Sequence, residues 1–441
     1  MTTTAAAGGV LANLEPQHDD RDPAWLTDAR LAALQWVGEH GFPTRKDEDW
    51  KYTALDPILA VPFQAATAGS SRRVSSDMVD AAAVDLGGIR LVFVNGHFAS
   101  EFSRSTGLPA GVEVTNLASV LAAGPERLEP FFARTPGEHH AFAAFNDALT
   151  EDGAFIQLAP GTSVDEPIHL VFLSDTGGSP LMSSPRSVIL ADRNSRATIV
   201  ETYAGIDGDV YCTNAVTEAV LADGAQIEHY KVQDEPVTAF HLALLDVRQG
   251  RDSRFSSRSV MLGSSIARHE VRVLLGDEGA EVSLDGVYLP RGDQLHDNTI
   301  YVDHDATNCT SHQLYKGVLE GRGHGVFNGH IMVRPGADGT DANQNNKNLI
   351  LSDRAEVDTR PRLEIYTDEV KCTHGAAVGQ LDEDALLYLR ARGIPREAAR
   401  GLLIYAFVQE MVDRIEVAPL RTQLEALVAT RFAKGDLSVE P

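Results

Sequence analysis

Short runs of alternating hydrophobic and polar residues fill the chain from about residue 154 to residue 371. Gly, Asp, Asn or Pro residues separate each run from the next. Because side chains of a strand point alternately to its two faces, a hydrophobic period of two indicates β-strands. The clearest runs are 167–172, 197–203, 225–230, 254–260, 280–287, 325–333 and 355–359. No convincing helical pattern interrupts them, so the sequence predicts a mainly β core.

These runs also recur at a nearly fixed distance. A small–x–apolar motif places its apolar residue at Ile199, Ile227, Phe255 and Val282, in steps of 28, 28 and 27 residues, and Val357 carries a similar motif later. A fixed repeat of about 20–50 residues is typical of stacked architectures, in which each turn buries its apolar face on the next. We therefore favour a β-solenoid with about 28 residues per turn. A β-sandwich with evenly spaced strands is the alternative.

The first 150 residues combine helix and strand patterns. Residues 1–21 are small, polar and acidic, and we expect them to form a flexible tail. Residues 22–150 are expected to form an α+β region, in which a helix begins at Asp22-Pro23 and ends at Gly41. The remaining expected elements are helices at 53–60, 114–134 and 137–150, a linker at 64–86 and a strand at 89–94. The β-helix core is expected to follow over residues 151–378.

A helical domain is expected from residue 379 to residue 441. Helical periodicity predicts helices at 382–392, 396–415 and 419–433. The middle helix carries an apolar stripe that consists of Ala399, Leu402, Leu403, Ala406, Phe407 and Met411. Such a stripe either caps the end of the solenoid or docks a partner protein, and the pattern leaves both readings open.

Charge and composition exclude several classes of protein. The 441 residues include 38 Lys and Arg against 63 Asp and Glu, a formal net charge of −25, which repels the phosphates of nucleic acids. No segment approaches the roughly 18 apolar residues of a membrane span, and the N-terminus lacks a signal-peptide pattern. Three cysteines, Cys212, Cys309 and Cys372, are too few for a disulfide framework. We therefore expect a cytoplasmic protein that binds neither nucleic acid nor membrane.

Candidate chemistry is concentrated near the end of the β pattern. Cys372 and His374 lie two positions apart, so in a strand their side chains project to the same face. A thiolate and an imidazole on one face can together hold iron, copper or zinc. The alternative is structural: Cys372 is then a small buried hydrophobe and His374 an ordinary polar side chain.

A second group of candidate metal ligands lies earlier. Five histidines fall within 35 residues, beside three aspartates, and these residues are His296, His304, His312, His324, His330, Asp297, Asp303 and Asp305. Residues one turn apart stack on a solenoid, yet no spacing here matches a known zinc motif, and hydrogen bonding is the commoner role. The chain has no Gly-x-Ser-x-Gly and no Walker A sequence, so we expect no ATP hydrolysis. Paired carboxylates of the kind used by glycosidases stay open.

Several long motifs resemble one known family. Residues 341–366 and the following Asp-Glu-Val-Lys-Cys-Thr-His-Gly-Ala resemble the SufB/SufD family of iron–sulfur cluster assembly proteins, as do residues 313–319 and the tail from Gly393. The segment 45–52 and the Cys-Thr-His-Gly form resemble the SufD branch of that family. The likeness spans about residues 40–435.

The resemblance implies a right-handed parallel β-helix core with α-helical N-terminal and C-terminal regions, which agrees with the repeat. It implies a non-enzymatic scaffold subunit that pairs with a SufB paralogue and binds the SufC ATPase through the C-terminal helices. A transient iron–sulfur cluster, shared with SufB, would form at their interface beside His374 and, less firmly, Cys372. No tightly bound cofactor is implied.

Other readings stay open at the level of sequence. The chain could form a homodimer in isolation. Its solenoid could belong to a carbohydrate-active enzyme or to a metal-binding solenoid protein. A structural, adhesin-like solenoid is a further class, against which the N-terminal sequence and the helical tail argue.

Overall fold

The computed structural model describes residue 14 and residues 22–69, 73–105, 107–132 and 140–433. The expected tail at 1–21 therefore lies, except for Leu14, outside the described residues. Leu14 itself is buried against the N-terminal helices.

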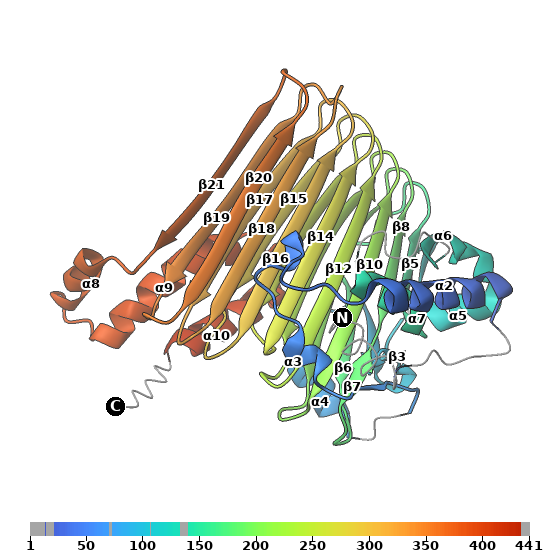
Figure 1. The fold of residues 1–441 in the computed structure, drawn as a ribbon, viewed down its shortest axis with the longest axis horizontal. Coiled ribbons are helices and arrows are strands. Elements are labelled where there is room, and N and C mark those ends of the chain that lie inside the picture. The colour runs from blue at the N-terminus through green and yellow to red at the C-terminus, as the bar shows by residue number, and fades with distance from the viewer. Residues whose placement is uncertain (1–13, 15–21, 70–72, 106, 133–139, 434–441) are drawn as a thin grey trace.

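The core of the molecule is a β-solenoid of about eight turns (Figure 1). From β8 onward, successive strands alternate between two sheets, so neighbours within a sheet are two strands apart in the chain. The first sheet contains, in spatial order, β20 (Glu356–Ile365), β18 (His324–Val333), β16 (Leu295–His304), β14 (Ile266–Leu275), β12 (Phe240–Gln249), β10 (Tyr211–Leu221), β8 (Arg186–Ala191), β5 (Gly153–Leu158) and β4 (Val112–Asn116). Beside this path, β7 (Leu181–Ser183) pairs with β10, and β1 (Gln64–Ala65) pairs with β7.

The second sheet has the same plan. It contains β21 (Lys371–Gly379), β19 (Asp341–Ile350), β17 (Thr310–Leu319), β15 (Glu281–Tyr288), β13 (Arg254–Met261), β11 (Gln226–Asp234), β9 (Arg196–Gly205), β6 (Ile168–Ser174), β2 (Ile89–Val94) and β3 (His97–Phe98). All pairs from β6 to β21 are parallel. The expected mainly β solenoid with helical ends is thus confirmed.

The register corrects the repeat that the sequence suggested. Ile227, Phe255 and Val282 are direct neighbours on β11, β13 and β15, as expected. Ile199, however, lies opposite His229, because β9 and β11 are offset by 30 residues rather than 28. Val357 lies in the other sheet, opposite Gly325. The turns between strands differ in length, so a constant sequence period assigns some residues to the wrong neighbours in the stack.

The corners between the sheets stack as regularly as the strands. Asn194, Asp252 and Asn308 adopt left-handed backbone conformations and alternate along the stack with Gly224 and Gly279, which do the same. The backbone N–H of each of these residues donates to a carbonyl in the next turn. A Cβ added to Gly279 would lie 2.4 Å from Oδ1 of Asp252, so glycine avoids a close contact as well as backbone strain at this corner.

Replacing Gly279 by alanine should therefore destabilise the solenoid measurably. The left-handed backbone and the contact with Asp252 act together, and strain of this kind costs about 1–3 kcal/mol. Gly292 is the matched control, because its φ is also positive but no atom lies within 4 Å of its added Cβ. Thermal unfolding should show a larger drop for Gly279→Ala than for Gly292→Ala. Equal drops would mean that corner stacking contributes nothing beyond backbone strain.

Most of the N-terminal region packs on the first turns of the solenoid (Figure 1). Its helices are α2 (Ala24–His40), α3 (Asp56–Leu59), α4 (Ser76–Ala82), α5 (Leu117–Ala123), α6 (Glu129–Phe132) and α7 (Ala141–Leu149), with 3₁₀ turns η1 (Glu48–Trp50), η2 (Ser100–Phe102) and η3 (Pro125–Arg127). The first helix ends at Gly41 as expected, but Pro23 occupies the N-cap position. Asp22 instead pairs with Arg30 at 2.5 Å.

Two other N-terminal expectations need correction. The expected linker at 64–86 contains α4, and it also contains β1, which pairs with β7. The expected helix at 114–134 begins as strand β4, which pairs antiparallel with β5, and continues as α5 and α6. Strand β2 joins the second sheet by pairing with β6, and β4 joins the first by pairing with β5, and both of these partners lie more than 35 residues away along the chain. Local hydrophobic patterns cannot reveal such pairings.

The C-terminal region forms α8 (Glu383–Arg390), α9 (Arg396–Val412) and α10 (Ala418–Ala433), close to the expected bounds. Helices α9 and α10 cover the outer face of the second sheet through an apolar layer that includes Val260, Leu262, Val287, Leu314, Ile404, Val408, Leu424 and Val428. Polar contacts fix the layer: Lys316 Nζ donates to the Phe407 carbonyl at 2.7 Å, and Arg414 pairs with Asp285 at 2.9 Å. Among the described residues, no helix is long and apolar enough to cross a membrane.

Candidate functional site

The last turn of the solenoid ends in two strands without an outer neighbour. Each of β20 and β21 is hydrogen-bonded to another described strand on one side, to β18 and β19 respectively. The residues of β20 are mostly half-buried, and those of β21 are mostly exposed. Unpaired N–H and C=O groups along such an edge are a template for a strand of another chain. The described structure thus offers two adjacent sheet edges at one end.

His374 lies on this last strand. It is in register with Gln344 of β19, which in turn pairs with Gln313 of β17. Both glutamines are buried, and Gln344 Nε2 donates to Gln313 Oε1 at 2.9 Å. His374 continues this column but is exposed, because no described strand stacks on β21. The stacked polar side chains of this column are therefore buried at Gln313 and Gln344 and exposed to solvent at the His374 imidazole.

Cys372 occupies the neighbouring column, opposite Ala342. It is half-buried and packs against a small apolar cluster that includes Ile331 and Val333. Burial raises the pKa of the Cys372 thiol. Because the thiolate is the metal-binding form, the structure makes Cys372 the less available ligand and His374 the more accessible one.

The N-terminal segment holds the outer face of β20. Asp49 pairs with Arg362 at 3.1 Å, and Glu48 pairs with Arg360. The guanidinium carbon of Arg268 lies over the adjacent Trp50, 3.9 Å from the centroid of the Trp50 ring. The pairs made by Glu48 and Asp49 tie the segment 45–52 to the final turn, and Trp50 ties it to β14.

The histidine-rich stretch is dispersed rather than gathered. His296 and His304 are buried, and their Nε2 atoms lie 2.9 Å from the Gly263 carbonyl and 2.8 Å from Ser311 Oγ. His312 is exposed on the second sheet, and His330 lies 3.1 Å from Glu364. Of the three aspartates, Asp297 pairs with the buried Arg268, and Asp303 and Asp305 pair with Arg334. His324 pairs with Asp358, which is outside this set, so the eight residues form no common site.

A buried polar network inside the solenoid escaped the sequence analysis. Glu201, His229, Lys231, Glu235 and His241 are all buried, and His241 Nδ1 lies 2.8 Å from the Glu235 carboxylate. Burial acts to raise the pKa of Glu201, but hydrogen bonding by His229 and nearby positive charge outweigh it and lower the pKa to about 2. Burial lowers the pKa of Lys231 to about 8. The alternation of side chains along a strand indicated these positions, because His229 and Lys231 lie two and four residues after Ile227 and so share its inward face.

Buried histidines should make the protein sensitive to acid. Burial lowers the pKa of His169 and His296 to about 3 and that of His304 to about 4. Unfolded histidine has a pKa of about 6.5, so between pH 6.5 and 4 the unfolded chain binds more protons than the folded one. Stability should therefore fall as pH drops through this window. Glu201 adds a loss in the same direction below about pH 4.5.

Denaturant midpoints at pH 7, 6, 5 and 4 measure this dependence. His304→Asn provides the matched variant, because an amide can keep a hydrogen bond to Ser311 without titrating. This variant should lose less stability between pH 7 and pH 5 than the parent chain. A midpoint that stays constant down to pH 4 would contradict the buried, neutral state of the three histidines.

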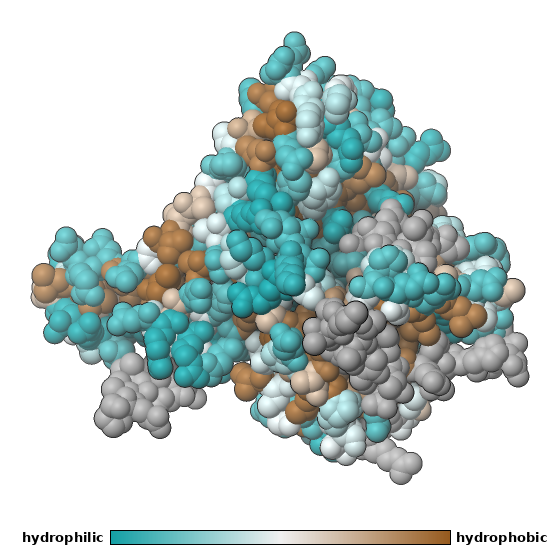
Figure 2. All heavy atoms as spheres, viewed as in Figure 1, coloured by the Kyte–Doolittle hydropathy of each residue, from teal (hydrophilic) through white to brown (hydrophobic). Residues whose placement is uncertain are grey.

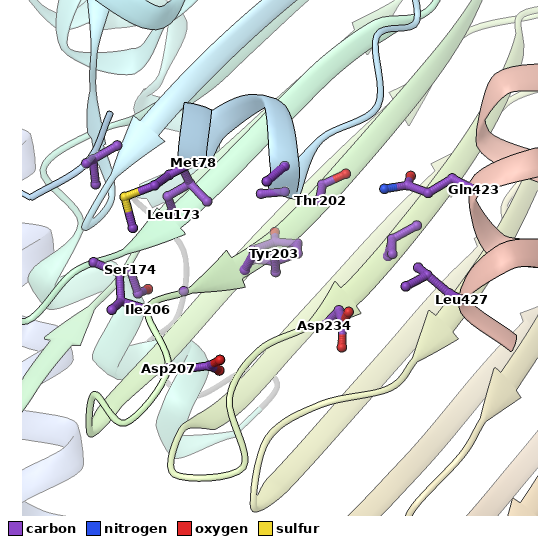
Figure 3. A pocket seen from close by; sticks show the side chains of 16 residues that line it. Met78, Leu173, Ser174, Thr202, Tyr203, Ile206, Asp207, Asp234, Gln423 and Leu427 are labelled. Atoms are coloured by element: carbon purple, nitrogen blue, oxygen red, sulfur yellow. The ribbon is translucent and has the colours of Figure 1, made fainter. Parts of the chain in front are cut away.

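A cavity of about 370 Å³ lies elsewhere, between α4 and α10 on the outer side of the second sheet (Figure 3). Met78, Leu173 and Leu427 supply apolar walls, and Thr202 and Asp234 supply polar ones. Burial raises the pKa of Asp234. None of the residues singled out from the sequence lines this cavity.

The six apolar residues of the C-terminal stripe divide between interior and surface. Ala399 and Met411 are buried, Leu403 and Phe407 are half-buried, and Leu402 and Ala406 are exposed. Leu387 and Tyr388 of α8 are also exposed, and Figure 2 shows hydrophobic residues at the surface over this end of the molecule. The apolar surface that is open to a partner therefore centres on Leu387, Tyr388 and Leu402. Met411 belongs to the layer on the solenoid.

Comparison with known proteins decides the family. The SUF system FeS cluster assembly SufBD core domain matches residues 172–407, and the SufBD N-terminal region matches residues 15–170. The chain belongs to the SufBD family. Family membership confirms the resemblance seen in the motifs, and the core-domain match covers the solenoid from β6 through most of α9.

SufBD proteins from several bacteria align with nearly the whole chain. An iron–sulfur cluster assembly SufBD family protein of Synechocystis is 32% identical over 421 residues, which cover 92% of this chain and 91% of that protein. The iron–sulfur cluster assembly protein SufD of Escherichia coli is 30% identical over 91% of this chain and 92% of its own length. SufD of Bacillus subtilis is 25% identical over 92% and 94%.

Proposed function

We propose that this chain is a non-catalytic scaffold subunit of the SufBCD iron–sulfur cluster assembly complex. The observation that carries the proposal is the exposed His374 on an uncovered end strand of a SufBD-family solenoid. The similarity to proteins named SufD supports assignment to that subunit rather than to SufB.

The free edges of β20 and β21 suit a SufB paralogue. A partner built on the same solenoid can continue both sheets, since strand addition satisfies the unpaired backbone groups. His374 would then face the seam between the two chains and supply one ligand to a transient iron–sulfur cluster, with Cys372 as the weaker candidate. A scaffold must release its product, so few and mixed ligands fit the task better than four fixed thiolates. When the chain is isolated from SufB, the same edges would pair two copies of it and so form a homodimer.

The C-terminal helices are the proposed docking surface for the SufC ATPase. Leu387, Tyr388 and Leu402 are exposed, while α9 and α10 are anchored to the solenoid by Lys316 and Arg431. Movement of a docked ATPase would therefore be transmitted to the strands beneath. The three cysteines are free, which is consistent with a reducing, cytoplasmic setting.

Co-purification tests this proposal. The tagged chain, co-expressed with a SufB paralogue and SufC, should give a stable complex of all three proteins. The purified chain alone should show no ATP hydrolysis, and it should carry no bound cofactor through gel filtration. A chain that stays alone in the presence of both partners would overturn the assignment.

A further inference from the structure

Three potential metal ligands meet on the outer face of the first sheet, at the start of the last two strands. His324 of β18 is in register with Glu356 of β20, and Asp358 lies two residues further along β20 on the same face. His324 Nε2 lies 2.8 Å from Asp358 Oδ2. One donor atom from each of the three side chains lies within 4.8 Å of the others.

We propose that His324, Glu356 and Asp358 bind a divalent transition-metal ion of the Zn²⁺, Mn²⁺ or Fe²⁺ type. Imidazole favours zinc and iron, and carboxylates favour manganese and other hard ions, so this mixed set suits the borderline cations. The metal–ligand bonds would be about 2.0–2.2 Å long, which small side-chain rotations can reach from the observed spacing. Three protein ligands leave coordination positions open, so the ion would be exchangeable.

Charge supports this assignment. Most acidic side chains on the outer face of this sheet are neutralised by an arginine, as Asp303 is by Arg334 and Asp297 by Arg268. Among the described residues, the recorded ion-pair partner of Asp358 is His324, and no lysine or arginine pairs with Glu356. Two carboxylates therefore share at most one positive charge. A bound divalent cation would neutralise the charge of the two carboxylates.

The strands pre-position the ligands. Backbone pairing between β18 and β20 fixes His324 beside Glu356, and the same pairing places His330 near Glu364 at the other end of these strands. The second pair has the same imidazole–carboxylate chemistry, but no third donor from the described part of the chain lies within reach of it. It provides an internal control. The proposed site is separate from His374, which lies on the second sheet, and it does not depend on the proposed assembly function.

Cobalt titration of the purified, tag-free chain tests the site. A Cys372→Ser/His374→Ala background removes the other candidate ligands. Saturable Co²⁺ binding with visible d–d bands and no sulfur charge-transfer band is expected. His324→Gln or Asp358→Asn should weaken binding at least about 100-fold, because loss even of a supporting outer-shell partner costs about 10–100-fold. His330→Gln should bind as the background does.

Two results would overturn the site: no saturable binding by the background chain, or equal affinity in the His324→Gln and His330→Gln variants. Circular dichroism checks that each variant folds. Should His324→Gln not fold, Glu356→Gln replaces it, since Glu356 is exposed. Thermal unfolding gives a second readout, because an ion that binds the folded chain raises its midpoint. Zn²⁺ should raise the midpoint of the background and of His330→Gln, but not that of His324→Gln.

Discussion

Replacing His374 by alanine is expected to abolish iron–sulfur cluster formation in the reconstituted three-protein complex. The imidazole is exposed on the last strand, so its loss removes a ligand without opening a cavity in the core. Absorbance of the cluster, with iron and sulfide counted per complex, measures the effect. The variant should still fold and still co-purify with both partners, which would separate the role of the ligand from the role of the interface.

His312→Ala is the matched control for this experiment. His312 is also exposed on the second sheet, two turns earlier on β17, and it has no place at the proposed seam. Assembly by this variant should be normal. Cys372→Ser should have a smaller effect than His374→Ala, because the thiol is half-buried and its pKa is raised. If the His374→Ala variant formed as much cluster as the parent complex, the imidazole would not be a ligand of the cluster.

The double change Leu387→Asp/Leu402→Asp is expected to weaken binding of the ATPase at least about 30-fold. Both side chains are largely exposed, at 62% and 51%, so the free subunit should fold normally. Truncation of a central apolar anchor typically costs about 2 kcal/mol or more, and a buried charge adds to that loss. Calorimetric titration of SufC into the purified subunit measures the change.

Leu31→Asp controls for the general effect of a new surface charge. Leu31 lies on α2, far along the chain from the C-terminal helices, and is 58% exposed. Its replacement should leave binding of the ATPase unchanged. If Leu31→Asp weakened binding as much as the double change did, the C-terminal helices would not be the docking surface.

Much of the fold was predictable because its rules are local and repeated. Strands of period two at regular spacing indicated the solenoid, and apolar stripes indicated the C-terminal helices. The exact register was not predictable. The offset of 30 residues between β9 and β11 depends on turn length, which hydrophobic counting does not measure. The pairing of β2 with β6 joins segments that the sequence separates, so it too required the structure.

The candidate site was predictable in part, for a related reason. The two-residue spacing correctly placed Cys372 and His374 on one face of a strand, but their different exposure depends on which strand ends the stack. The metal-ligand set of His324, Glu356 and Asp358 spans two strands whose alignment is a property of the coiled chain. The charged residues of the interior, such as Lys231, were visible as polar residues at inward positions and could have been recognised by parity alone.

Amide hydrogen exchange with and without the SufB paralogue tests most directly whether the open end of the solenoid is the partner interface. Binding should slow exchange across β20 and β21, residues 356–365 and 371–379, because a partner strand would pair their free backbone groups. Exchange in β11, which is already paired on both sides, should not change. Protection elsewhere, with β20 and β21 exchanging as fast as in the free chain, would contradict the account.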